Sequence, residues 1–219
     1  MIALLLIYRV FSMALFLSCC HKKTTLTMKR MKTLSLLFAA SFFALVACDT
    51  KSNQQDSKEI AEEQNEEKFE DTDLEDDTEF AVTAAEGGML EVQLAQLALT
   101  KATSPKVKEF AQSMVDDHSK ANEELKSLAQ TKNISLPSTL SEKCQKDYND
   151  LAEKSGADFD KAYSEFMVKD HKEDLDKFKK AADKAEDGDI KSWAAGKVPV
   201  LEHHLAMAES LEDAVEANN

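Results

Sequence analysis

Four ionisable side chains stand where a helical repeat predicts a buried face, and they are Glu91, His118, His171 and His204. Imidazole nitrogens and carboxylate oxygens are ligands for transition-metal ions, so the set could bind one such ion. The alternative is a hydrogen-bonded polar layer that fixes helix register, with Asp and Glu holding the histidine tautomers. Both interpretations need the four side chains in one layer, because burying them without partners is costly.

Four further residues stand beside these candidate ligands in the sequence: Met114, Met167, Asp117 and Asp170. Each Met precedes a His by one helical turn and would add a soft sulfur donor. Each Asp directly precedes a His and is a candidate hydrogen-bond partner for the buried imidazoles. They belong to two segments, 110–118 and 163–171, that repeat an aromatic residue, Met-Val and Asp-His at the same spacing. The repeat indicates either a duplicated half-domain or two helices that serve one shared site.

A di-iron centre of the ferritin type is less favoured than a single ion. Such a centre needs two Glu-x-x-His pairs, so that both ligands share a helix face. The residue three positions before each candidate His is Val or Leu, never Glu. No Ser/His/Asp, Cys/His or Gly-rich phosphate signature indicates another enzyme class. The sequence therefore favours a non-catalytic binding role, with a metal-dependent or redox-stress protein as the alternative, and it leaves the ion's identity open.

Apolar residues recur at helical spacing from Phe80 onward, and the helices they predict would position the candidate ligands. Long helices are expected to start at residues 80, 105, 158 and 189, with a shorter helix over about 139–154. Ser104-Pro105 is typical of a helix start, because Ser caps the first turn and Pro needs no amide donor there. Gly196 and Pro199 are expected to weaken or kink the last helix.

These elements predict an all-α fold: an up-and-down four-helix bundle with one extra short helix between the second and third long helices. Each long helix carries one candidate ligand near its middle, so antiparallel packing would bring the four into one layer. His203, the neighbour of His204, points to the side. Gly87 and Gly88 inside a helix cost stability relative to Ala, so we expect a neighbouring helix to approach closely there.

Charge divides the chain of 219 residues into three regions, with a net formal charge of −14 overall. Residues 1–48 carry +6, residues 49–79 carry −11, and residues 80–219 carry −9. An acidic chain does not suit phosphate backbones, so no nucleic acid is expected as a partner. Residues 48–79 are almost entirely polar and are predicted to be a lipidated Cys followed by a disordered acidic tether, ahead of a bundle domain at 80–217.

Residues 31–47 are predicted to be a lipoprotein signal peptide. Basic residues flank an apolar stretch over 34–46 that is too short to span a bilayer comfortably. It ends in Leu45-Val46-Ala47-Cys48, which resembles the lipobox of bacterial lipoproteins, where the Cys thiol receives the lipid. Residues 1–30 are then either an upstream extension from a misassigned start or an extra hydrophobic segment.

A lipidated Cys48 makes the membrane the partner that the sequence predicts. The acidic surface of the bundle could bind an ion or a protein partner, and the sequence leaves that protein unidentified. We therefore expect a lipid-anchored protein in the envelope of a Gram-negative bacterium. It would face the periplasm, with the outer membrane favoured, or stand at the cell surface.

Several segments together resemble one known family, and they are 84–92, 107–111, 114–118, 134–137, 156–160, 167–171 and 201–205. In this order, over about 80–215, they resemble the domain-of-unknown-function family 4142. The resemblance implies a ferritin-like helical bundle in an exported or outer-membrane protein, and it implies no particular activity. The family's histidine positions match His118, His171 and His204, whereas Val198-Pro199 stands where the family commonly has Leu-Pro.

Overall fold

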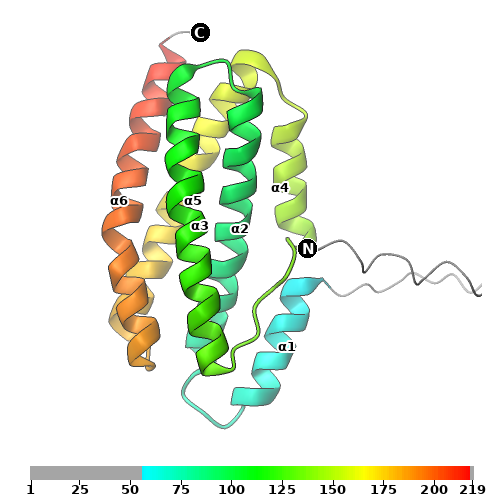
Figure 1. Cartoon of the computed structure of the whole chain (residues 1–219), viewed down its shortest axis with the longest axis vertical. Helices are drawn as coiled ribbons and strands as arrows, with labels where there is room; N and C mark the ends of the chain where they lie inside the picture. Colours follow the sequence, from blue (N-terminus) through cyan, green and yellow to red (C-terminus); the bar gives the residue numbers. More distant parts are fainter. Residues whose placement is uncertain (1–55, 218–219) are drawn as a thin grey trace, which may run out of the picture. The chain divides into compact units, whose positions relative to one another are not determined.

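The computed structural model describes residues 56–217, and every regular element in this range is an α-helix. The six helices are α1 (Ser57–Phe69), α2 (Glu75–Lys101), α3 (Pro105–Lys132), α4 (Glu142–Ala152), α5 (Gly156–Lys184) and α6 (Gly188–Glu216) (Figure 1). The all-α prediction is therefore confirmed for this range. The predicted extension 1–30, signal peptide 31–47 and lipidation site Cys48 lie outside the described residues.

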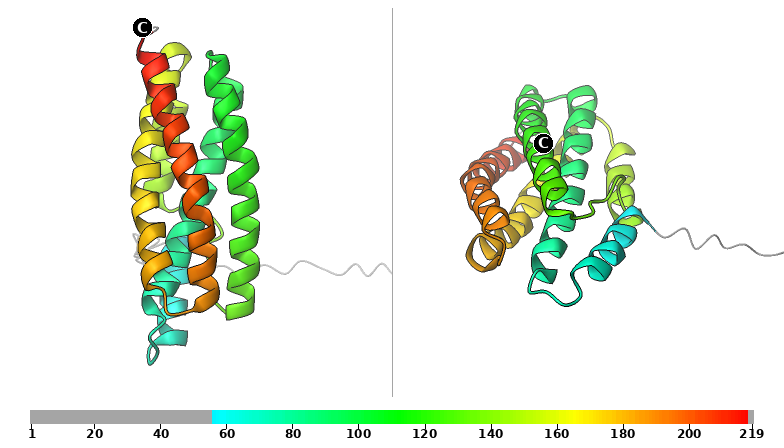
Figure 2. Two further views of the ribbon diagram at one scale, coloured as in Figure 1. Left: turned by 90° about the vertical axis from the view of Figure 1, so that its left-hand side faces the viewer. Right: turned by 60° about the horizontal axis from the view of Figure 1, so that its bottom comes forward.

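The four longest helices lie side by side as two helical hairpins, α2 with α3 and α5 with α6 (Figures 1 and 2). Contacts of α2 with α5 and of α3 with α6 join the two hairpins into one bundle. The short helix α4 packs on α2 and α5, and α1 packs on α2. Among residues 56–217, no helix combines the length and the apolar character needed to cross a membrane.

Local sequence signals explain where several helices begin and end. Pro105 occupies the first turn of α3, as the sequence predicts, and Asn133 ends that helix in the left-handed region at φ 58°. The side chain of Asp187 accepts hydrogen bonds from the amides of Asp189 and Ile190, so it caps α6. Gly196 and Pro199 lie within α6, which nevertheless runs unbroken from Gly188 to Glu216.

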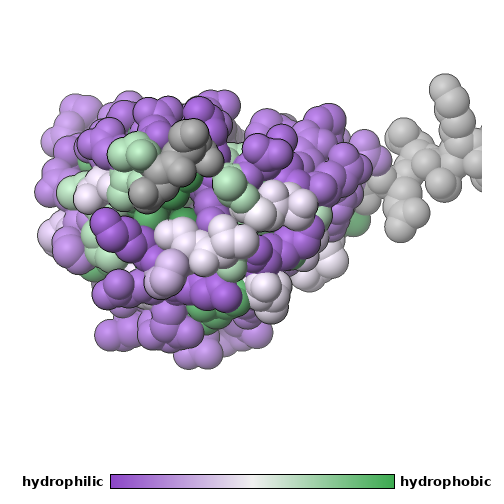
Figure 3. Space-filling view, turned by 90° about the horizontal axis from the view of Figure 1, so that it is seen from above, coloured by the Kyte–Doolittle hydropathy of each residue, from purple (hydrophilic) through white to green (hydrophobic). Residues whose placement is uncertain are grey.

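The core lies mainly in one half of the bundle. A large cluster of buried side chains there includes Leu94, Met114, Phe159, Tyr163 and Met167, each fully buried. Smaller clusters fill the other half, where the rings of Phe80, Phe178 and Trp193 contact one another. Seen end-on, mostly hydrophilic residues surround a smaller area of apolar and intermediate residues, as amphipathic helices require (Figure 3).

The two adjacent glycines of α2 sit where other helices come close, as the sequence predicts. A Cβ on Gly88 would overlap the side-chain amide of Asn122 on α3. A Cβ on Gly87 would stand 3.4 Å from Oδ2 of Asp174 on α5. The close approach of α3 thus accounts for the missing side chain at Gly88, whereas a Cβ at Gly87 would make only an ordinary van der Waals contact with Asp174.

The prediction of a disordered tether reaching residue 79 is wrong for residues 57–79. Residues 57–69 form α1, and α2 begins at Glu75 rather than at residue 80. The segment has the composition of a disordered one, because α1 needs few apolar residues: it buries only Ala61 and Asn65, both 2% exposed. Polar contacts to the loop before α4 supply what its scarce apolar surface does not.

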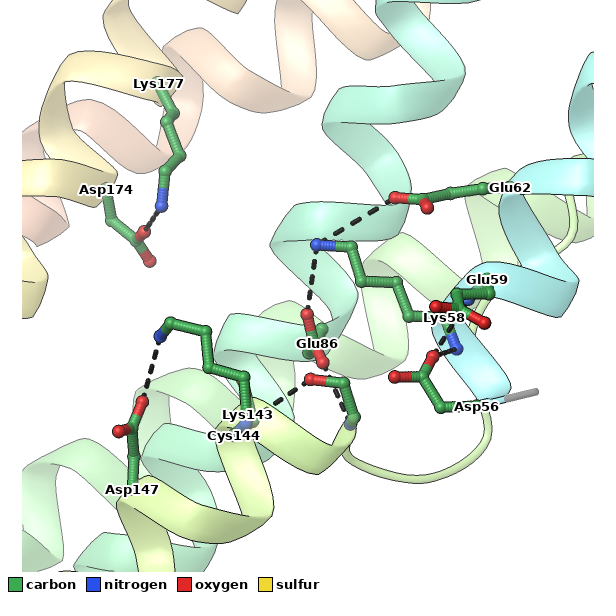
Figure 4. A network of polar contacts seen from close by, with 11 residues as sticks. Asp56, Lys58, Glu59, Glu62, Glu86, Lys143, Cys144, Asp147, Asp174 and Lys177 are labelled. Carbon is green, nitrogen blue, oxygen red and sulfur yellow. Dashed lines mark hydrogen bonds and ion pairs between the residues drawn. The ribbon is translucent and has the colours of Figure 1, made fainter. Parts of the chain in front are cut away.

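Those polar contacts join α1 to two other parts of the bundle. Asn65 donates through Nδ2 to the carbonyl of Ser135 (2.9 Å) and accepts from its amide through Oδ1 (2.7 Å). Lys58 pairs with Glu86 of α2 at 3.2 Å, and the same carboxylate accepts from the amide of Ser141, the cap of α4, at 2.9 Å (Figure 4). Glu86 therefore links α1, α2 and α4.

Candidate functional site

The structure brings the four predicted candidate ligands together in the bundle interior, one from each long helix. They are Glu91 of α2 (1% exposed), His118 of α3 (7%), His171 of α5 (0%) and His204 of α6 (0%). His203 is exposed, so the predicted difference between the two adjacent histidines is also found. On α3, α5 and α6, the histidine falls between residues of the large core cluster and residues of the smaller clusters.

The three imidazoles converge. One ring nitrogen from each of His118, His171 and His204 lies within 4.8 Å of the other two. His118 Nε2 is 3.2 Å from His204 Nδ1. The ring centroids are 5.2 to 5.7 Å apart, and the rings of His118 and His204 stack at 28°. One nitrogen from each ring therefore faces a shared space between the three histidines.

Backbone geometry fixes the tautomer of His171. Its Nδ1 is 2.9 Å from the carbonyl oxygen of Met167, one turn earlier on α5. A carbonyl oxygen only accepts hydrogen bonds, so the proton of the neutral ring is on Nδ1. The lone pair therefore sits on Nε2, the nitrogen on the side of Glu91, whose Oε1 is 3.6 Å away.

In each of the other two imidazoles, a carboxylate contacts the ring nitrogen that points away from the neighbouring imidazole. Glu91 Oε2 is 2.7 Å from His118 Nδ1, and Asp117 Oδ2 is 2.9 Å from His204 Nε2. If both carboxylates are ionised, each accepts an N–H, and the lone pairs are left on His118 Nε2 and His204 Nδ1. Those two nitrogens face each other at 3.2 Å. Two lone pairs at this distance repel unless a cation lies between them.

The separation of the two nitrogens suits such a cation. A tetrahedral ion with metal–nitrogen bonds of about 2.0–2.1 Å places its ligands about 3.3 Å apart. Metal-bound histidines characteristically donate their other N–H to a carboxylate or carbonyl oxygen. All three histidines here have that partner, in Glu91, Asp117 and the Met167 carbonyl.

A protonated Glu91 gives the alternative, a structural polar layer. Glu91 would then donate to His118, His118 to His204, and His204 to Asp117, with no ion. Burial, with Asp174 nearby, raises the pKa of Glu91 well above its usual value, which favours this state without an ion. However, among the described residues, Glu91 Oε1 and His171 Nε2 have no hydrogen-bond partner. The chain of hydrogen bonds thus leaves part of the layer unsatisfied.

Burial keeps the imidazoles neutral. Desolvation lowers the pKa of His118 to about 4 and that of His171 to about 3, and it also lowers the pKa of His204. Neutral imidazole is the form that binds a metal ion. The three histidines are therefore ready to act as ligands at neutral pH, whereas exposed histidines would be partly protonated below about pH 6.5.

The four neighbouring candidates take different places. Asp117 contacts His204 of α6 across the helix interface, whereas its neighbour in the sequence is His118. Asp170 points Oδ2 into the interior beside Glu91 and His171. Met114 and Met167 are fully buried in the large core cluster, and the contact of Met167 with His171 is made by its carbonyl oxygen.

Two polar residues that the sequence analysis did not choose as site residues, Asn122 and Asp174, also border the layer. A small cavity of about 110 Å³ extends from the layer between α2, α3, α5 and α6. Glu91 and His118 line it together with these two residues and the exposed Asp117 and Lys120. The sequence signal for Asp174 is its position one helical turn before Phe178, which places both residues on the inner face of α5. The cavity therefore adjoins the layer at Glu91 and His118.

Comparison with known proteins gives one result. The model of a family described as "Domain of unknown function (DUF4142)" matches residues 53–211. The match includes α1, so the helix in the acidic segment is part of the family's domain. No curated protein and no solved structure matches the chain.

Proposed function

The chain belongs to the family described as domain of unknown function (DUF4142), and we propose that this member is a lipid-anchored envelope protein whose helical bundle binds one transition-metal ion. The ligands are His118, His171 and His204. Glu91 and Asp117 orient two of them, and the Met167 carbonyl orients the third.

One observation carries the metal proposal: the approach of His118 Nε2 to His204 Nδ1 at 3.2 Å, with a carboxylate behind each ring. A hydrogen-bonded layer with a protonated Glu91 would account for this approach, but it leaves His171 Nε2 without a partner among the described residues. An ion accounts for both the convergence and the orienting partners. Three neutral nitrogens suit a borderline ion such as Zn²⁺, Co²⁺ or Cu²⁺ better than Mg²⁺ or Ca²⁺.

Thermal unfolding with and without Zn²⁺ tests the proposal. A ligand that binds only the folded state stabilises it by about 2.7 kcal/mol at a hundredfold excess over Kd. His204→Ala should abolish this stabilisation. His203→Ala, the matched control on the exposed side of α6, should retain it. Equal responses of the two variants would show that Zn²⁺ binds elsewhere.

The finer architecture that we propose is a ferritin-like, up-and-down four-helix bundle, in which α2, α3, α5 and α6 are the four helices and α4 is the extra one. The short connections within both hairpins support it, since they make sequential helices antiparallel. A crystal structure with these four helices in another order would contradict it.

The membrane anchor that we propose rests on the sequence alone, on Leu45-Val46-Ala47-Cys48 after a basic and apolar segment. Lipid on Cys48 would place the bundle in the periplasm or at the cell surface, with the outer membrane favoured. Metabolic labelling with a fatty acid tests the anchor directly. Absence of label from the protein would contradict it.

The cavity favours a second candidate function, a metal-dependent or redox-stress protein. Glu91 and His118 line it, so a small molecule entering it would come close to the ion. A catalytic ion needs a free coordination position, and three protein ligands leave one. If this function is correct, azide should perturb the visible spectrum of the Co²⁺-loaded protein. An unchanged spectrum would favour the non-catalytic binding role.

A further inference from the structure

Three buried polar atoms lie together next to the three-histidine cluster without hydrogen-bond partners among the described residues. They are Glu91 Oε1, Asp170 Oδ2 and His171 Nε2. One ligand atom from each of these residues lies within 4.8 Å of the others. Glu91 comes from α2, and Asp170 and His171 are consecutive on α5, which packs against α2. Two helices thus hold this group.

Within residues 56–217, no side chain or backbone group makes a hydrogen bond to any of these three atoms. His171 Nε2 carries a lone pair, because Nδ1 faces the Met167 carbonyl at 2.9 Å. Lys177, a cation on the same helix, is engaged with Asp174 at 2.8 Å (Figure 4). Three acceptors around one space are costly to bury without a cation or a proton among them.

The donor set differs in kind from that of the three histidines. Two carboxylate oxygens and one imidazole make a harder set than three imidazoles, and oxygen-rich sets suit Mn²⁺ and Fe²⁺. The one donor atom that both sets could use is His171 Nε2, whose single lone pair can serve only one ion at a time.

We propose that Glu91, Asp170 and His171 form a second position, for a harder divalent cation such as Mn²⁺, which excludes an ion from the three-histidine position. The bundle then holds one ion in either of two places, according to the kind of ion. Because the two positions share His171, this inference deepens the proposed function and rests on it.

Mn²⁺ binding to the purified full-length protein tests the second position. Free Mn²⁺ gives a six-line electron paramagnetic resonance signal that falls as the ion binds, and Zn²⁺ affinity is measured in parallel by competition with a chelating dye. Asp170→Asn should weaken Mn²⁺ binding at least about tenfold, because even the loss of a residue that only orients a ligand weakens metal affinity about 10–100-fold. It should leave Zn²⁺ affinity within about threefold of that of the unmodified protein. His204→Ala should do the reverse. Zn²⁺ should release Mn²⁺ from the unmodified protein.

A measurement on the unmodified protein keeps the test independent of whether variants fold. Pulsed resonance of bound Mn²⁺ should show coupling to one imidazole nitrogen, that of His171. Coupling to two or three imidazoles, unchanged Mn²⁺ affinity in Asp170→Asn, or joint loss of both ions in each variant would overturn the second position. Absence of Zn²⁺ binding, with Mn²⁺ still bound through one imidazole, would instead contradict the three-histidine site.

Discussion

Replacement of Asn65 by Ala tests whether α1 is a docked part of the domain. Asn65 is 2% exposed and exchanges two hydrogen bonds with the backbone of Ser135, at 2.7 and 2.9 Å. The change removes both bonds and leaves a partly buried amide and carbonyl of Ser135 without these partners. It also leaves a gap under α1, because the replacement side chain is shorter.

The expected loss follows from these contacts. Leaving buried polar groups unsatisfied costs about 1–3 kcal/mol. Ala favours a helix over Asn by roughly 0.5 kcal/mol, which offsets part of that loss. The net destabilisation should be about 1–2 kcal/mol, or roughly 2–8 °C in Tm for a domain of this size. The loss cannot exceed the free energy that docks α1, since α1 can detach while the rest stays folded.

Thermal unfolding by circular dichroism measures the loss, and limited proteolysis within 57–69 reports detachment of α1. Glu66→Ala, at an exposed neighbouring position of the same helix, is the matched control and should change neither readout. If Asn65→Ala unfolds at the same temperature as the control and resists protease equally well, α1 does not dock through Asn65. The acidic segment would then be the solvated tether that its composition predicts.

Three further predictions concern the anchor and the buried layer. Cys48→Ser should leave the protein unlipidated, so cell fractionation that still finds it in the membrane at its normal size would contradict the lipoprotein interpretation. Asp117→Ala should weaken Zn²⁺ binding by roughly 10–100-fold in a competition titration, because Asp117 orients His204, whereas Asp116→Ala should not. Without metal, stability relative to His171→Gln should fall as pH drops from about 6.5 toward 4, because the unfolded imidazole takes up a proton near its usual pKa while burial lowers the folded pKa to about 3. Urea unfolding of the two proteins at several pH values measures the difference in their stability, and a pH-independent difference would contradict the reasoning.

Helical periodicity alone predicted which side chains share the buried layer. Glu91, His118, His171 and His204 each fell on an apolar stripe, and a stripe must face the core. The same pattern separated His204 from the exposed His203. Sequence could not assign partners across helices, however, because periodicity gives a direction from one helix axis and no distance to the next. Asp117 therefore contacts His204 rather than its neighbour in the chain.

The acidic segment shows a different limit. Net charge and scarce apolar residues predicted disorder for 49–79, yet α1 makes polar contacts to particular backbone groups between α3 and α4. Such contacts depend on a loop more than 60 residues away, at Ser135, which local composition does not report. The glycine pair was more informative, because Gly88 lowers helix stability and lies where Asn122 of α3 occupies the space that a Cβ would need.

X-ray absorption at the zinc edge of the Zn²⁺-loaded protein reports directly whether three imidazole nitrogens bind one ion. We expect three imidazole nitrogens at about 2.0–2.1 Å from zinc in the unmodified protein, and two in His204→Ala if that variant still holds zinc. His203→Ala should give the same spectrum as the unmodified protein. Zinc coordinated by fewer than three imidazoles in the unmodified protein, or a spectrum that His204→Ala does not change, would contradict the three-histidine site.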